Sequence, residues 1–198
     1  MNVFLSFVSA ALLAVFVQNS VLERALGVNV LLYASRKKEH LPGFFFAITY
    51  VTTISSAIVC GLDRLLNGWE YYAAVMPILY ITVVSAVYIL TLAAIWWFFP
   101  RLFRSLKKYV HLSVFNCSVI GALFLGGQLG GDLPSYLGYG FGTGVGFLVA
   151  AYLLYIARDR LYSPLVPAAF RGFPIMTVYV GILSLALYAF TGYSTAAM

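Results

Sequence analysis

Six stretches of the chain contain no Asp, Glu, Lys or Arg, and most of their positions are apolar. These stretches cover residues 1–22, 40–62, 71–100, 109–131, 133–157 and 172–198. Each reaches about the 20 residues that a helix needs to cross a hydrocarbon core of about 30 Å. The apolar positions are continuous, whereas a membrane β-barrel shows short segments of alternating hydrophobicity. The pattern predicts an all-α integral membrane protein with six transmembrane helices, in which residues 1–198 form a single membrane domain.

The first and fourth of these helices are predicted to be broken. Residues 1–35 would form a helix of roughly 50 Å at 1.5 Å per residue, which is too long for one simple span. Polar residues interrupt this region around Gln18 and Asn19, so we expect a break there; the alternative is one long tilted helix. A similar polar stretch, 111–118, opens the fourth helix. Polar residues at such depth are tolerated where broken backbone faces the protein interior.

The two breaks occur near the start of each half of the chain, 1–99 and 100–198. Each half has three predicted helices, and three crossings reverse the side of the membrane, so the halves must have opposite orientations. This arrangement predicts an inverted repeat, with the working site near the midplane where the halves meet. The sequence similarity between Asn19–Leu22 and Asn116–Ile120 is thin, so the repeat is a hypothesis.

The connections between the predicted helices differ in charge. Three connections are basic: the first at 36–40, the third at 101–108 and the fifth at 158–171. The second, at 63–70, and the fourth, at Asp132, are not basic. Because Lys and Arg favour the cytoplasmic side, six spans with both termini on the non-cytoplasmic side satisfy every connection. Topology therefore accounts for the net charge of +6 without nucleic acid or a specific anionic lipid as a ligand.

Composition agrees with this class of protein. Of the residues, 63% are hydrophobic, 17% aromatic and 9% charged, whereas a soluble domain carries about 25% charged residues. The aromatic content also excludes a disordered chain. The two cysteines, Cys60 and Cys117, both lie inside apolar stretches, which argues against a secreted disulfide framework.

Few residues suggest chemistry. The glycine-rich stretch 139–146 follows no strand, so it is not a nucleotide-binding loop. Gly138, Gly142 and Gly146 instead share one helix face, on which a neighbouring helix can approach closely. The sequence offers no catalytic residues and no site for an organic cofactor. Cys117 is the one candidate metal ligand, although a lone cysteine in a membrane is usually a small apolar residue.

Several segments match a known family in order along nearly the whole chain. They are QNSVLERALGVN at 18–29, NCSVIGA at 116–122, YGFGTGVGF at 139–147, VPAAFRG at 166–172 and SLALYAFTG at 184–192. With these segments, the chain resembles the integral membrane subunits shared by the Rnf complex and the sodium-pumping NADH:quinone oxidoreductase, Nqr. Within that family the resemblance is strongest to the A-type subunit of Rnf and to its counterpart, the E-type subunit of Nqr.

The resemblance implies a multi-pass protein of the prokaryotic cytoplasmic (inner) membrane that pairs with a homologous six-helix subunit of opposite topology. It also implies a [2Fe–2S] cluster between the two, with other subunits carrying flavin and iron–sulfur centres. The ligand in the second half corresponds to Cys117, but Asn29 occupies the position of the ligand in the first half. Asparagine cannot provide a thiolate, and such clusters are normally held by four. Cys60 lies away from that position and is no substitute.

Three hypotheses follow. In the first, the chain is a membrane subunit of a Na⁺- or H⁺-translocating oxidoreductase, a translocase in which electrons cross the membrane through the shared cluster. In the second, it is a divergent scaffold subunit of the same complex without redox chemistry, as Asn29 suggests. In the third, it is a stand-alone secondary transporter built on the same inverted repeat. The sequence identifies neither the coupling ion nor the electron donor.

Overall fold

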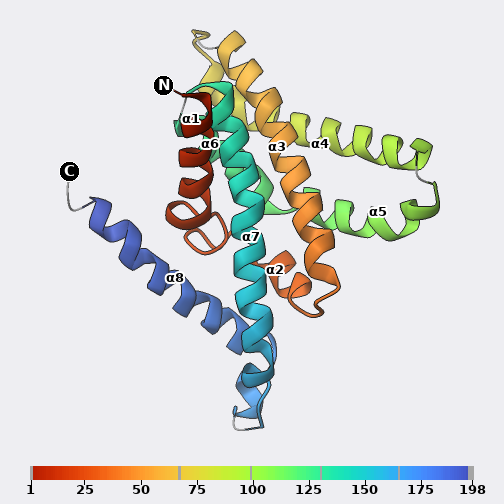
Figure 1. Cartoon of the computed structure of the whole chain (residues 1–198), viewed down its shortest axis with the longest axis vertical. Coiled ribbons are helices and arrows are strands. Elements are labelled where there is room, and N and C mark those ends of the chain that lie inside the picture. Colours follow the sequence, from red (N-terminus) through yellow and green to blue (C-terminus); the bar gives the residue numbers. More distant parts are fainter. Residues whose placement is uncertain (1, 67, 99, 130, 165, 196–198) are drawn as a thin grey trace.

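The computed structural model describes residues 2–66, 68–98, 100–129, 131–164 and 166–195, and this part of the chain folds into helices without a strand (Figure 1). The helices are α1 (Val3–Leu12), the π-helix η1 (Leu13–Val17), α2 (Val28–Ala34), α3 (His40–Leu66), α4 (Tyr72–Phe98), α5 (Pro100–Val114), α6 (Cys117–Leu129), α7 (Leu133–Leu161), the 3₁₀ turn η2 (Ala168–Phe170) and α8 (Phe173–Thr195).

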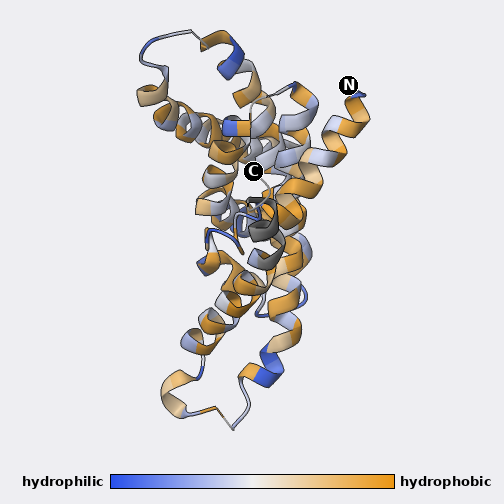
Figure 2. Ribbon diagram, turned by 90° about the vertical axis from the view of Figure 1, so that its left-hand side faces the viewer, coloured by the Kyte–Doolittle hydropathy of each residue, from blue (hydrophilic) through white to orange (hydrophobic). Residues whose placement is uncertain are grey.

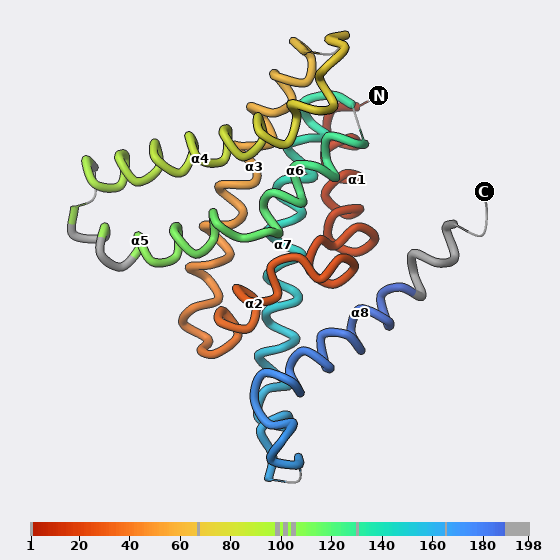
Figure 3. Tube along the Cα trace, turned by 180° about the vertical axis from the view of Figure 1, so that it is seen from behind, coloured from red at the N-terminus to blue at the C-terminus, as the bar shows by residue number. Residues whose placement is uncertain are grey.

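Helices α3 and α7 run in opposite directions and form the centre of the molecule (Figures 1 and 3). The Thr52 hydroxyl of α3 donates a hydrogen bond of 2.7 Å to the carbonyl of Gly140 in α7. A Cβ added at Gly140 would lie 2.9 Å from the Thr52 carbonyl oxygen, so only glycine allows this close approach. Backbone contact of this kind is common between helices in membranes, because the hydrophobic effect does not drive helices together in lipid and close packing does.

A second face of α7 packs against α1 through the glycines that the sequence predicts as a packing surface. A Cβ added at Gly138 or Gly142 would overlap backbone atoms of Phe7 or Ala11, both in α1. A Cβ at Gly146 would lie 2.7 Å from the Asn19 side-chain nitrogen, just beyond η1. The prediction that this face serves close helix packing is therefore confirmed.

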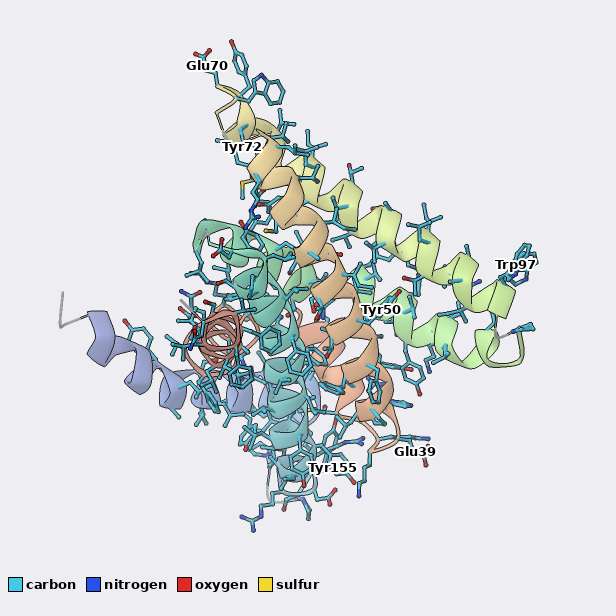
Figure 4. The ribbon with its side chains drawn as sticks, turned by 45° about the horizontal axis from the view of Figure 1, so that its top comes forward. Glu39, Tyr50, Glu70, Tyr72, Trp97 and Tyr155 are labelled. Atoms are coloured by element: carbon cyan, nitrogen blue, oxygen red, sulfur yellow. The ribbon has the colours of Figure 1, made fainter. Side chains whose placement is uncertain are left out.

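Two parts of the molecule extend away from this core: the pair α4–α5, and α8 (Figures 1 and 3). They carry exposed large apolar side chains, including Trp97 on α4 (Figure 4) and Leu185 on α8. Hydrophobic residues cover most of α3, α4 and α7, and the most hydrophilic stretches lie mainly at turns and helix ends (Figure 2). Exposed apolar surface on this scale is typical of a chain that faces lipid or partner subunits.

The helices are those of an all-α integral membrane protein, within the described residues. Three are long and apolar enough to cross a membrane: His40–Leu66, Tyr72–Trp97 and Leu133–Leu161. There is a fourth if one bent pair of helices is a single span, namely Leu106–Val114 with Cys117–Leu129. Two further apolar stretches are shorter, Val3–Val17 and Phe173–Tyr188. The number of six spans therefore remains a prediction.

Four of the five connections gather at two ends of the core. At one end, the Arg158 guanidinium donates a hydrogen bond to the backbone carbonyl of Arg36, which joins connections one and five. At the other end, Arg64 forms an ion pair of 3.2 Å with Asp132, which joins connections two and four. Glu39 and Glu70, which flank α3, mark the two ends in Figure 4. The third connection, 101–108, lies within α5, which extends to one side of the core (Figure 1).

Candidate cofactor cavity between two helix breaks

The first break in the helical backbone lies between η1 and α2, and the side chain of Asn19 organises it. The Asn19 Oδ1 accepts hydrogen bonds from the backbone N–H groups of Val21 and Leu22 at 3.0 and 3.1 Å. Its Nδ2 donates to the carbonyl of Val15 at 2.9 Å. Buried backbone groups must find partners, and here one buried side chain serves three of them.

The second break lies between α5 and α6, whose flanking segments bend by 51° at residues 115–116. The Asn116 Oδ1 accepts a hydrogen bond of 3.1 Å from the backbone N–H of Ser118, so this side chain caps the first turn of α6. Asn116 is only 1% exposed, yet its Nδ2 has no hydrogen-bond partner among the described residues. It is one of six buried side-chain atoms in the described ranges that have no partner.

The two breaks contact each other directly. The hydroxyl groups of Ser20 and Ser118 share a buried hydrogen bond of 2.7 Å. Gly27 has φ +76°, a conformation that disfavours a Cβ, and its backbone lies against Asn116. A Cβ added at Gly27 would overlap the Asn116 Oδ1. Glycine at this position therefore permits both the turn and the contact between the two breaks.

A cavity of about 260 Å³ lies at this contact, lined by residues 25–30 and 115–117. Cys117 and Asn29 both line it, and both are exposed in the single chain. The structure therefore brings together Cys117 and Asn29, the two positions that the family resemblance singles out. Cys60 is buried in α3 and lines a different cavity, beside Asp63.

The described residues do not form a metal site within this chain alone. No three His, Cys, Asp or Glu side chains come together in the described ranges. One exposed thiol does fit a cluster shared between two chains, because the remaining thiolates can come from a partner that covers the cavity. Asn116 lines the same wall, although its unpartnered Nδ2 is buried beneath the surface of the single chain.

Sequence reasoning missed two features of this cavity. It read Asn116 only as part of a motif with Cys117, and nothing in the sequence shows that half of its amide is left without a partner in the described part of the chain. It gave Gly27 no role at all. A glycine two positions before Asn29, between two helical segments, was the available signal, because such positions often have a positive φ.

Comparison with known proteins places the chain among membrane subunits. A family model for "Rnf-Nqr subunit, membrane protein" matches residues 7–194. The A-type subunit of the ion-translocating oxidoreductase complex of Syntrophotalea carbinolica is 35% identical over 179 residues, which cover 90% of this chain and 93% of that protein. The A-type subunit of the Na⁺-translocating ferredoxin:NAD⁺ oxidoreductase complex of Acetobacterium woodii is 30% identical over 179 residues, with the same coverage.

Proposed function

The chain belongs to the Rnf–Nqr family of membrane subunits, and we propose that it is a subunit of a prokaryotic ion-translocating oxidoreductase that shares a [2Fe–2S] cluster with a homologous subunit. Relatives that cover nine-tenths of the chain are named as the A-type subunit of such complexes, which supports membership of a complex. The partners are then a homologous membrane subunit of opposite topology and the subunits that carry flavin and iron–sulfur centres.

We propose that the chain crosses the membrane six times, in two inverted halves, with α1–η1 and α2 as the broken first span and the end of α5 with α6 as the broken fourth. The support is that both breaks are capped by an asparagine, Asn19 and Asn116, and meet at the Ser20–Ser118 hydrogen bond. Broken helices in corresponding positions of two inverted halves typically form a binding site near the midplane. The basic connections one and five, which lie at the same end, would face the cytoplasm.

The observation that carries the cofactor proposal is the position of Cys117 in the cavity between the two breaks. A [2Fe–2S] cluster, when bound, accepts and releases one electron at a time. In this chain the Cys117 thiolate would hold iron. Asn29 contributes a neutral amide to the wall and no thiolate, so the other ligands would come from a second chain and from a group that is not a thiolate of this chain.

Iron content and low-temperature electron paramagnetic resonance (EPR) of the reduced complex test this proposal. In Cys117→Ser we expect an iron–sulfur signal to disappear or shift, because serine lacks the thiolate. Cys60→Ser is the matched control, since it removes the other thiol of the chain from a different cavity and should leave the signal unchanged.

The scaffold hypothesis makes the opposite prediction and has Asn29 in its favour. If every signal of the complex stays the same in Cys117→Ser, and the iron content does not fall, this chain holds no cluster. The fold and the family membership would remain, and the chain would serve as a structural subunit.

A further inference from the structure

A carboxylate near the end of α3 is enclosed by three tyrosines from two other helices. Asp63 accepts hydrogen bonds from the hydroxyl groups of Tyr80, at 3.1 and 3.0 Å to its two oxygens, and of Tyr136, at 2.8 Å. The hydroxyl of Tyr72 donates to Oδ1 of the same carboxylate. Tyr72 and Tyr80 belong to α4 and Tyr136 to α7, so this tyrosine cage forms only when the three helices pack together.

The tyrosine cage is built to hold the hydroxyl groups close to the carboxylate. Tyr80 and Tyr136 are 1% and 5% exposed, so their phenol groups are fixed by packing. A Cβ added at Gly127 would lie 2.5 Å from the Tyr80 hydroxyl oxygen, so glycine in α6 leaves room for that group. The site lies at the end of α3 marked by Glu70 and Tyr72 in Figure 4.

The charge of Asp63 has no positive partner in the part of the chain that the structure describes. The neighbouring Arg64 lines the same cavity but pairs with Asp132, at 3.2 Å, and not with Asp63. The described groups that donate to the Asp63 carboxylate are neutral phenols. A carboxylate held only by neutral donors keeps a full negative charge that attracts a cation.

A cavity of about 350 Å³ opens beside the carboxylate. Its lining includes Asp63, Tyr72 and Tyr136, together with Cys60, Arg64 and Met76. One water molecule takes up about 30 Å³ in the liquid, so the space holds a cation with several waters. The phenol oxygens keep lone pairs that can bind a cation while their hydrogens point to the carboxylate.

We propose that Asp63, with the hydroxyl oxygens of Tyr72 and Tyr136, binds one Na⁺ ion in this cavity. All the ligands are hard oxygens, which suit ions of this type better than softer metals. One uncompensated carboxylate matches a single positive charge, whereas divalent sites gain affinity from further charged ligands. The binding of Na⁺ does not depend on the cluster; its use as a station for a transported ion rests on the proposed function.

Equilibrium binding of ²²Na⁺ to the assembled, detergent-solubilised complex tests the site, at constant ionic strength and without any electron donor. We expect Asp63→Asn to abolish one saturable component of binding. Tyr136→Phe keeps the charge and removes one oxygen ligand, so its affinity should fall by about tenfold, which corresponds to about 1.4 kcal/mol. Asp159→Asn, at the other end of α7, is the matched control and should bind as the unchanged protein does.

Two results would overturn the proposal. The first is that Tyr136→Phe and Asp63→Asn both bind ²²Na⁺ with the same affinity and capacity as the unchanged complex. If the complex with Asp63→Asn does not assemble, the result for Tyr136→Phe decides alone. The other is displacement of ²²Na⁺ from the unchanged complex by choline as effectively as by unlabelled Na⁺, since choline cannot coordinate to oxygen ligands. Because no electron transfer is needed, a failed cluster test and a failed Na⁺ test are separate outcomes.

Discussion

The two helix breaks use the same residue type in different ways. At the first break, both ends of the Asn19 amide are engaged, and all its partners are backbone groups nearby in sequence. At the second break, Asn116 uses only its oxygen, and its nitrogen has no partner among the described residues. A buried amide that is fully satisfied stabilises the fold, whereas one with an unsatisfied donor contributes less because that group has lost water without gaining a partner. The first break is therefore held more completely by its asparagine than the second.

The largest effect that separates the two breaks is expected at Gly27. In Gly27→Ala, the positive φ costs about 1–2 kcal/mol and the overlap with Asn116 about as much again, so unfolding should become easier by about 3 kcal/mol. Gly172→Ala is the control, because φ there is +91° but no described atom lies within 4 Å of the added Cβ. Unfolding of the full chain by sodium dodecyl sulfate in mixed micelles measures both.

If Gly27→Ala and Gly172→Ala lose the same stability, backbone strain explains the whole effect and the breaks are not tightly packed. A second variant makes the test sharper. Adding Asn116→Ala to Gly27→Ala removes the overlapping side chain, so the double variant should regain part of the lost stability.

The next effect is the difference between the two asparagines. Asn19→Ala leaves two buried N–H groups and one carbonyl without partners, and we expect it to lower the free energy of unfolding by about 2 kcal/mol. Asn116→Ala removes a single helix cap, for a loss of about 1 kcal/mol. The same unfolding assay compares them, and equal losses would contradict this difference in how far the two asparagines stabilise their breaks.

This contrast also shows how far sequence reasoning reaches. Long apolar stretches and glycines four residues apart predict an all-helical membrane protein and the packing face of α7, because both follow from local composition. The resemblance to a family singled out Cys117 and Asn29, which the fold then places on one cavity. The number of spans is not settled by length alone, since the first apolar helix is short and the fourth span would be a bent pair of helices.

The parts that could not be predicted depend on contacts between distant residues. From the sequence, Asp63 is expected to be a charged residue in a polar connection between two helices. Nothing in the sequence shows that Tyr80 and Tyr136 enclose its carboxylate. The open amide nitrogen of Asn116 is equally invisible, because a missing hydrogen bond depends on everything packed around it. Motifs identify which residues matter, and the fold decides which of their atoms are free.

The smallest expected effect tests whether the two breaks act together. In a double-mutant cycle, Ser20→Ala and Ser118→Ala should show a coupling of about 1 kcal/mol, because each removes the partner of the other in a buried hydrogen bond. Ser113→Ala is the matched control, since its buried hydroxyl has no partner among the described residues and should not couple to Ser20→Ala. Coupling with Ser118 alone would show that the link is specific to the junction of the breaks. A coupling near zero would mean that the two breaks are neighbours whose stabilities are independent, and the cavity between them would then depend on Gly27 and Asn116.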